Sequence, residues 1–139
     1  MKRREIIYNK FGGKCAYTGK PLDEKWQIDH ITPKAFEGWY YSEISRKAMN
    51  CKGDDINSIE NLLPALRIVN HYKRAFDLEG FRQYMLTFHL RVAKLPRNPR
   101  IEKSKKRKEY MLQVADAFGI TSENPFDGIF YFEKEIKTE

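Results

Sequence analysis

Three short segments of the chain hold polar side chains whose types could support hydrolysis. The first, IDHITP, spans residues 28–33 and places the carboxylate of Asp29 beside the imidazole of His30. The second, NLLPA, begins at Asn61, and the third, NHYK, begins at Asn70. A neutral imidazole titrates near neutral pH and can take a proton from water, whereas carboxylate and amide oxygens suit a hard cation such as Mg²⁺. The three segments therefore offer both a base and cation ligands.

Taken in order, the three segments resemble the sequence pattern of HNH endonucleases, which are also called ββα-metal or His-Me finger nucleases. Asn70 follows Asn61 by nine positions, a family-like distance. The resemblance covers about residues 11–75, roughly half of the 139 residues. An adjacent Asp and His occur in many proteins by chance, so the specificity lies in the three segments together. The resemblance implies an α+β fold whose ββα-metal core is a short antiparallel hairpin and a helix clasping one metal ion.

The resemblance also implies a role for each polar residue. Asp29 would ligate a divalent cation, and His30 would be the general base beside the scissile phosphate. Asn61 matches the middle Asn of the family, which holds the loop and the base in place. Asn70 would be the second metal ligand, on the helix. The expected cation is Mg²⁺, with Mn²⁺ or Ni²⁺ as alternatives, and it would act as a Lewis acid that steadies the leaving group.

His71 leaves the identity of the second metal ligand open. Adjacent helical residues point about 100° apart, so only one of Asn70 and His71 can face the metal squarely. The distance from Asn61 favours Asn70, whereas a His71 ligand would suit softer ions such as Mn²⁺, Ni²⁺ or Zn²⁺. Lys73, one helical turn beyond Asn70, and Arg74 are natural phosphate contacts. The alternative for both is an ordinary exposed helix charge.

The cysteines depart from the family pattern. Many HNH proteins carry a structural zinc held by two Cys-x-x-Cys pairs, which would fall here at Cys15 and Thr18 and at Leu66 and Val69. Only Cys15 is a cysteine, and tetrahedral structural zinc needs four thiolate or imidazole ligands. We therefore expect no structural zinc, with Cys15 as a small buried hydrophobe and the two apolar residues as packing. Cys51 has no other metal-ligand residue at a suitable spacing in the sequence.

The chain is basic, with a formal net charge of +7 and a pI of about 9.4, which favours a polyanionic partner such as nucleic acid. A basic run after residue 96 is a predicted phosphate-binding surface that would make binding steeply salt-dependent. A solvated helix face is the alternative interpretation. The run consists of Arg97, Arg100, Lys103, Lys105, Lys106, Arg107 and Lys108.

Apolar spacing and turn residues predict the elements that must position these side chains. We expect a helix over 2–11, a short strand around residues 26–28, a second strand over 59–65 and a helix over 66–75. Further helices are expected from about 79 to 94 and over 100–118. Candidate buried positions in the last of these are Ile101, Tyr110, Met111, Val114 and Phe118.

The remaining segments are less regular. Residues 34–58 form an insert, with one or two helical turns at 42–49, whose aromatic side chains could shape a substrate groove or form local core. The tail from 124 to 136 is apolar enough to dock as a last strand or turn. We expect a single domain over 1–139, with an HNH core at about 11–75 and a helical basic extension at about 78–139.

The sequence thus predicts a metal-dependent HNH endonuclease that hydrolyses DNA phosphodiester bonds. A catalytically silent nucleic-acid-binding module of the same fold is one alternative, and a structural or protein-interaction domain is another. One HNH site cuts one strand at a time, so double-strand cutting would need a homodimer. No signal peptide or membrane-spanning run is visible, and two cysteines are too few for a disulfide scaffold, so we expect a cytoplasmic protein without a membrane partner.

Overall fold

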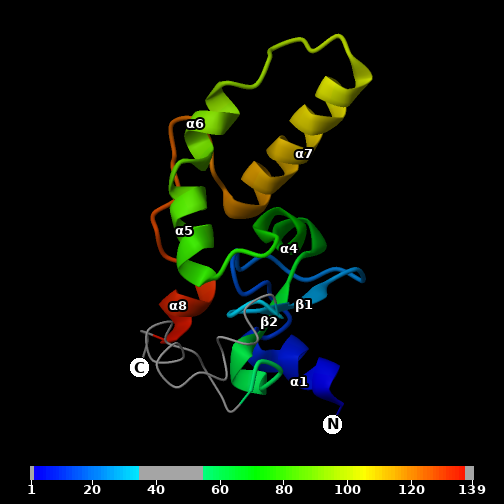
Figure 1. Cartoon of the computed structure of the whole chain (residues 1–139), viewed down its shortest axis with the longest axis vertical. Helices are drawn as coiled ribbons and strands as arrows, with labels where there is room; N and C mark the ends of the chain where they lie inside the picture. The colour runs from blue at the N-terminus through cyan, green and yellow to red at the C-terminus, as the bar shows by residue number, and fades with distance from the viewer. Residues whose placement is uncertain (1, 35–54, 137–139) are drawn as a thin grey trace.

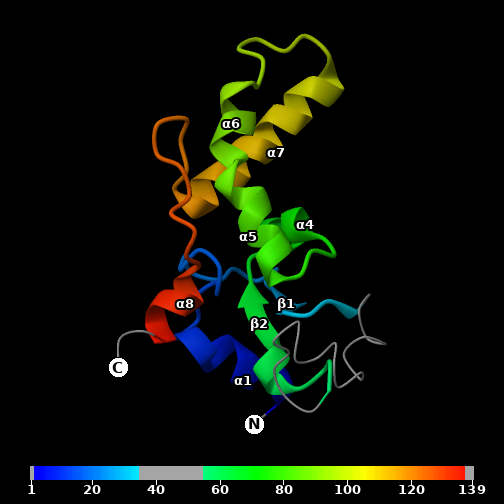
Figure 2. The ribbon, with the colours of Figure 1, turned by 60° about the vertical axis from the view of Figure 1, so that its left-hand side comes forward.

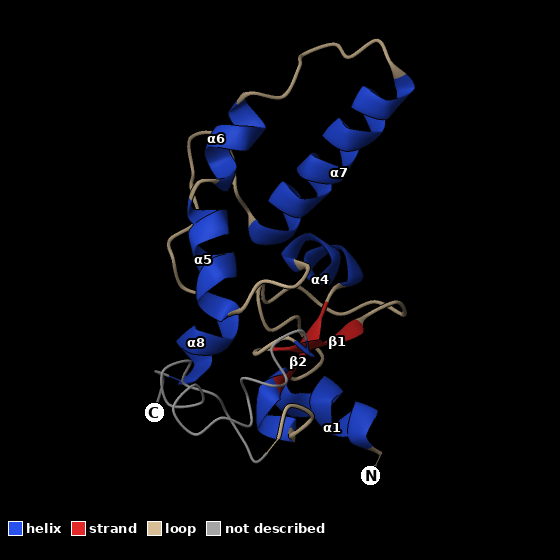
Figure 3. Ribbon diagram, viewed as in Figure 1, coloured by secondary structure: helices blue, strands red, loops and turns tan. Residues whose placement is uncertain are grey.

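The candidate site is built on a two-stranded antiparallel hairpin followed directly by a helix. The computed structural model describes residues 2–34 and 55–136. Strand β1 (Gln27–His30) pairs with β2 (Leu62–Ala65), and the register runs from Gln27 opposite Ala65 to His30 opposite Leu62. Helix α4 (Arg67–Lys73) begins two residues after β2. The predicted α+β class and the hairpin are confirmed, and Figure 3 shows the two strands as the red elements between α1 and α4.

The two faces of the hairpin are covered by different parts of the chain. Successive strand residues point to opposite faces, and Gln27 and Asp29 contact side chains of α4. On the other face, Ile28 packs against a small cluster formed by Ile7, Trp26 and Leu62. The adjacent residues Asp29 and His30 are therefore directed to different environments.

The N-terminal segment supplies the second face. Helix α1 (Arg3–Tyr8) continues into the 3₁₀ turn η1 (Asn9–Phe11), and Gly12 ends it in the left-handed region at φ 62°. This agrees with the helix predicted over 2–11. The guanidinium of Arg4 stacks over the ring of Trp26, 3.9 Å from its centroid. The N-terminal helix is thus tied to the residue that precedes β1.

The C-terminal half contains four described helices, α5 (Leu78–Leu86), α6 (Phe88–Ala93), α7 (Glu102–Phe118) and α8 (Tyr131–Ile136). The helix predicted over 79–94 is two helices, because Thr87, at φ −104° and ψ 4°, leaves the helical region. Asp77 caps α5 by accepting a 2.8 Å hydrogen bond from the backbone N–H of Gly80. In Figures 1 and 2 helix α7 extends away from the hairpin to the far end of an elongated molecule.

Two local predictions for this half were wrong. The tail docks onto the main core as expected, but it forms helix α8 rather than a strand, with its aromatic side chains packed into that core. Ile101 is 69% exposed, since it precedes the first residue of α7 instead of lying on its buried face. Met111 and Val114 are buried as expected, and Tyr110 and Phe118 are partly buried against the core.

Helix α8 closes the core over the segment that precedes β1. The backbone N–H of Tyr131 donates to the carbonyl of Tyr17 at 3.2 Å, and that of Phe132 donates to Ala16 at 2.8 Å. The ring of Tyr17 makes edge contacts with Phe130 and Phe132. The helix therefore fixes the backbone and the ring of Tyr17 together. Of the helices in residues 2–34 and 55–136, none has the length and apolar character to cross a membrane.

Candidate functional site

The carboxylate of Asp29 is the most heavily bonded group of the hairpin. The side chain is 7% exposed and lies between Tyr17 and the end of α4. The hydroxyl of Tyr17 donates a hydrogen bond to its Oδ2 atom. The ammonium Nζ of Lys73 lies 3.1 Å from Oδ2 and 3.4 Å from Oδ1. Burial and the neighbouring Asp29 charge raise the pKa of Tyr17 well above its usual value, so the phenol keeps the proton that it donates.

Lys73 is fully buried, at 0% exposure, in the last turn of α4. In addition to Asp29, its ammonium donates to the backbone carbonyl of His30 at 3.1 Å. A buried charge is tolerated only when it is paired and hydrogen-bonded, and these two partners meet that need. This placement differs from the expected exposed phosphate contact, because the side chain turns toward the carboxylate of Asp29 instead of toward solvent.

His30 is held from outside the hairpin and is partly exposed. Its Nε2 atom lies 3.0 Å from Oδ1 of Asn57. An amide oxygen only accepts hydrogen bonds, so Nε2 carries the proton and the lone pair of the neutral ring is on Nδ1. The contact therefore selects the tautomer in which Nδ1 can act as a base.

Asn61 ties the loop that leaves β1 to the segment that enters β2. Its side chain is 0% exposed, accepts a 2.9 Å hydrogen bond from the backbone N–H of Thr32, and donates to the carbonyls of Thr32 at 3.2 Å and Ile56 at 2.7 Å. The backbone N–H of Ile31 also donates to the carbonyl of Asn61 at 2.8 Å. The loop that follows His30 is thus fastened to the segment that precedes β2. This geometry is what the expected loop-holding role of Asn61 needs, and it makes Asn61 a positioning residue.

Asn70 and His71 face different neighbours. The amide Nδ2 of Asn70 donates to Oε1 of Gln27 at 2.8 Å, so Asn70 lies against the face of β1 that also carries Asp29. His71 is exposed and its Nδ1 lies 2.7 Å from the hydroxyl of Tyr110 on α7. Of the two alternatives for the second ligand, Asn70 is the one directed at the hairpin.

The oxygen ligands near Asp29 are of the types that a hard divalent cation prefers. In this structure Asp29 is bonded to Lys73 and Tyr17, and Asn70 is bonded to Gln27. Asp29 supplies a carboxylate, and Asn70 and Gln27 supply amide oxygens on the same face of β1. Within the described ranges, no three His, Cys, Asp or Glu side chains group together to hold a metal ion. A cation would therefore rely on one carboxylate and amide oxygens, and it would share that carboxylate with the ammonium of Lys73.

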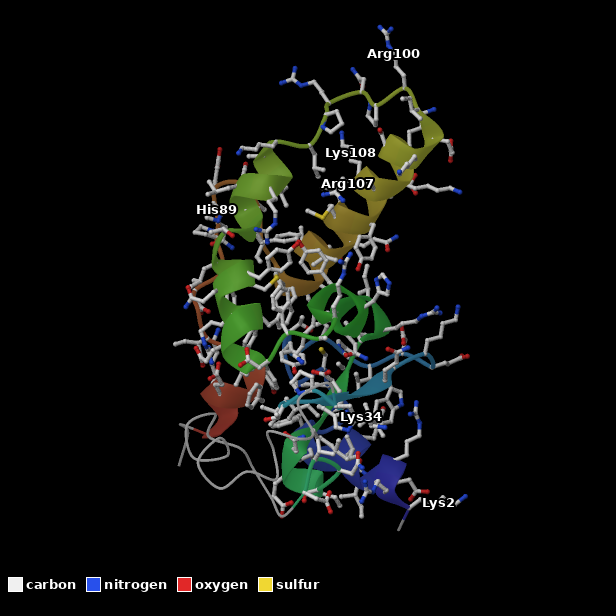
Figure 4. The ribbon with its side chains drawn as sticks, viewed as in Figure 1. Lys2, Lys34, His89, Arg100, Arg107 and Lys108 are labelled. Carbon is white, nitrogen blue, oxygen red and sulfur yellow. The ribbon has the colours of Figure 1, made fainter. Side chains whose placement is uncertain are left out.

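The expected phosphate contacts lie in two places. Arg74 is exposed at the end of α4, where its φ of 55° is the one positive value among the described non-glycine residues. The basic run lies around the start of α7, at the end of the molecule opposite the hairpin. Figure 4 labels Arg100, Arg107 and Lys108 there, with Lys34 at the hairpin end. The amine of Lys108 donates to the carbonyl of Arg97 at 2.8 Å, and most of the run is exposed.

Three of the four positions at which the HNH pattern places zinc cysteines lie in or against the apolar core, and Thr18 is half-buried outside it. Cys15 and Val69 are fully buried, and Leu66 packs against the same cluster. The backbone N–H of Leu66 lies 3.5 Å from Sγ of Cys15. Cys51 and the predicted helical turns at 42–49 lie outside the described residues.

Sequence reasoning missed three residues of the site, Tyr17, Gln27 and Asn57. Gln27 carries a weak signal, since it lies two positions before Asp29 and therefore on the same strand face. The other two come from irregular segments with no periodic pattern. Comparison of the chain with protein-family models, with curated proteins and with solved structures finds no match in any of the three.

Proposed function

We propose that this protein is a metal-dependent HNH endonuclease that hydrolyses DNA phosphodiester bonds with His30 as general base. The observation that carries the proposal is the setting of His30 next to Asp29 at the end of β1. The imidazole is accessible and has its Nε2 proton engaged by Asn57, while the neighbouring carboxylate is buried under α4. Two adjacent side chains are thereby prepared for different tasks, proton transfer and cation binding.

The proton step follows from the tautomer. Hydrolysis requires a water that loses a proton as it attacks phosphorus. Nδ1 of His30 would accept that proton, and the resulting imidazolium would keep donating from Nε2 to Oδ1 of Asn57. Asn61 would keep the loop behind His30 in register with β2 through its three side-chain bonds.

Asp29 and Asn70 would hold the cation, with Mg²⁺ preferred and Mn²⁺ or Ni²⁺ as alternatives. When bound, the ion would stabilise charge on the phosphate and on the leaving 3′ oxygen. Asn70 lies against the face of β1 that carries Asp29 and Gln27, whereas His71 lies against Tyr110 on α7. This arrangement supports Asn70 over His71 as the second cation ligand.

The charge distribution supports DNA as the substrate. The net charge of +7 favours a polyanion, and the basic run around the start of α7 offers phosphate contacts at a distance from β1 (Figure 1). A single site of this kind would nick one strand, and a homodimer would be required for double-strand cutting.

One observation favours the second candidate, a catalytically silent nucleic-acid-binding module. The charge of Asp29 is already balanced by Lys73, so the pair could be purely structural. A protein of that kind would bind DNA with salt-dependent affinity and would leave plasmid intact in any metal.

Plasmid cleavage decides between the two candidates. Supercoiled DNA is incubated with wild type, His30→Ala and His89→Ala in Mg²⁺, Mn²⁺ or EDTA. His89 lies on α6, away from the hairpin, and serves as the matched control (Figure 4). We expect metal-dependent nicking by wild type and by the control, and a loss of about 10²–10⁴-fold for His30→Ala, the range contributed by a general base. Equal cutting by all three would remove His30 as the base, and tight binding without cutting would establish the silent module.

A further inference from the structure

The buried ammonium of Lys73 has no part in the proton transfer described above. It lies at 0% exposure with two acceptors, the carboxylate of Asp29 at 3.1 Å and the carbonyl of His30 at 3.1 Å. A lysine is rarely buried completely, because its charge loses hydration. Its ion pair with Asp29, which is also the proposed cation ligand, and its hydrogen bond to His30 must therefore offset this loss.

Two positive charges cannot share this carboxylate without strong repulsion. Like charges a few ångströms apart repel, and a buried site screens the repulsion poorly. Among the described residues, Asp29 is the one acidic side chain paired with Lys73, and the hydroxyl of Tyr17 already donates to its Oδ2. A divalent cation that binds the buried carboxylate of Asp29 therefore competes directly with the ammonium.

The end of α4 is built in a way that lets the lysine leave. Lys73 is the last residue of the helix, and the following residue, Arg74, has φ 55° and ψ −133°. This conformation is unfavourable for a side chain with a Cβ and stores strain at the helix end. Because Lys73 lies at this helix end, the strain at Arg74 lowers the cost of rearranging the backbone next to it.

We propose that Lys73 is a resident counter-ion of Asp29, which a divalent cation must displace before it can bind. The inference rests on the proposed function, because it takes Asp29 as a cation ligand. Without the cation, the ammonium keeps the buried carboxylate neutralised. With the cation bound, the released ammonium becomes free to contact a DNA phosphate. Lys73 thereby sets the cation concentration at which the site becomes loaded.

The first test uses the wild-type chain. The protein is acetylated with an N-hydroxysuccinimide ester in Mn²⁺ or in EDTA, and the modified lysines are identified by mass spectrometry. We expect Lys73 to be protected in EDTA and modified in Mn²⁺, whereas the exposed Lys94 is modified equally in both. Binding of Mn²⁺ with Lys73 still protected would overturn the displacement.

The second test measures Mn²⁺ affinity by calorimetry for wild type, Lys73→Gln and the matched surface variant Lys94→Gln. Glutamine keeps a hydrogen-bond donor near Asp29 and removes the charge. We expect the Kd for Mn²⁺ to fall at least about tenfold in Lys73→Gln, since removal of an adjacent positive charge favours a cation. Lys94→Gln should match wild type. An unchanged or weaker affinity in Lys73→Gln overturns the inference, and the labelling test decides if this variant does not fold.

The outcomes separate this inference from the proposed function. Metal-dependent cleavage by wild type, together with unchanged Mn²⁺ affinity in Lys73→Gln, would leave the nuclease standing and remove the counter-ion role. No Mn²⁺ binding by either protein and no cleavage would remove both. Binding by Lys73→Gln alone would support the counter-ion role even if wild type cuts no DNA.

Discussion

The Nε2 atom of His30 lies 3.0 Å from Oδ1 of Asn57, a residue 27 positions further along the chain. The two residues belong to different kinds of element, since His30 ends β1 whereas Asn57 belongs to the turn before η3 (Ile59–Asn61). The contact means that the tautomer of the proposed base is set by a loop, and that loop is itself held by the side chain of Asn61 at Ile56.

The first prediction concerns this contact. Asn57→Ala should lower kcat for plasmid nicking by about tenfold or more, because a hydrogen bond to a charged group contributes about 1.5–3 kcal/mol. KM should change little, since the residue acts through His30. Asn57→Asp keeps an acceptor oxygen and should recover most of the rate. Equal loss in both variants would show that the amide matters for folding of the loop and not for the proton on Nε2.

A second prediction concerns the clamp made by Asn61. Asn61→Ala removes three buried side-chain hydrogen bonds, two to Thr32 and one to Ile56. Each such bond contributes about 0.5–1.5 kcal/mol, so the free energy of unfolding in urea should fall by about 1.5–4.5 kcal/mol. Asn98→Ala, at an exposed position of the loop before α7, is the matched control and should change stability little. A small effect at Asn61 would mean that water replaces its bonds.

A third prediction uses the raised pKa of Tyr17. Burial, first, and then the Asp29 carboxylate raise this pKa well above the ordinary tyrosine value of 10.0. A group whose pKa is higher in the folded state contributes stability that is complete below its unfolded pKa and is lost as pH rises above it. Wild type should therefore lose stability above about pH 10, and Tyr17→Phe should lose less over the same interval. Urea unfolding at about pH 8 and about pH 11, on either side of the unfolded pKa, measures the difference.

Other buried tyrosines also contribute to this alkaline loss. The pKa of Tyr72 is raised to about 12, mainly by burial. Tyr72→Phe should therefore also lose less stability than wild type, and it measures the share of the loss that comes from a phenol other than Tyr17. If Tyr17→Phe and wild type lost the same stability between the two pH values, the hydroxyl of Tyr17 would not be the titrating group.

A fourth prediction concerns the basic run at the start of α7. Replacing Lys103, Lys105 and Lys106 with glutamine should weaken DNA binding and make its salt dependence less steep. The log–log slope should change by about 0.9 for each DNA phosphate that the variant no longer neutralises. Cleavage at saturating DNA should persist, because the start of α7 lies at the opposite end of the molecule from β1, which His30 ends (Figure 1). An unchanged slope in gel shifts would make the run a solvated helix face.

Local sequence patterns located both strands and the helix that follows, whereas the pairing of the two strands was implied only by the family resemblance. The apolar residues around Ile28 and Leu63, separated by a polar segment, indicate the two strands. Helical spacing of apolar residues indicates α4. The same reasoning joined α5 and α6 into one helix, because Thr87 has no strong breaking tendency and its conformation depends on tertiary packing.

The partners of the polar residues were not predictable in the same way. A lysine in a helix is by default exposed, and only the folded chain brings Lys73 to Asp29. Tyr17 and Asn57 reach the site from irregular segments, where no period relates a residue to the face it will occupy. Sequence patterns indicate neighbours within an element, whereas these contacts join elements far apart along the chain.

The docking of α8 has a practical consequence for handling the protein. Its first residues bond to the backbone of Ala16 and Tyr17, and Phe130 and Phe132 pack on the ring whose hydroxyl donates to Asp29. Ending the chain before Phe130, or attaching a bulky tag there, would remove the packing that holds Tyr17 against Asp29 without altering either residue. Loss of activity in such a variant would reflect a missing support, and its repair would lie in restoring the C-terminal helix.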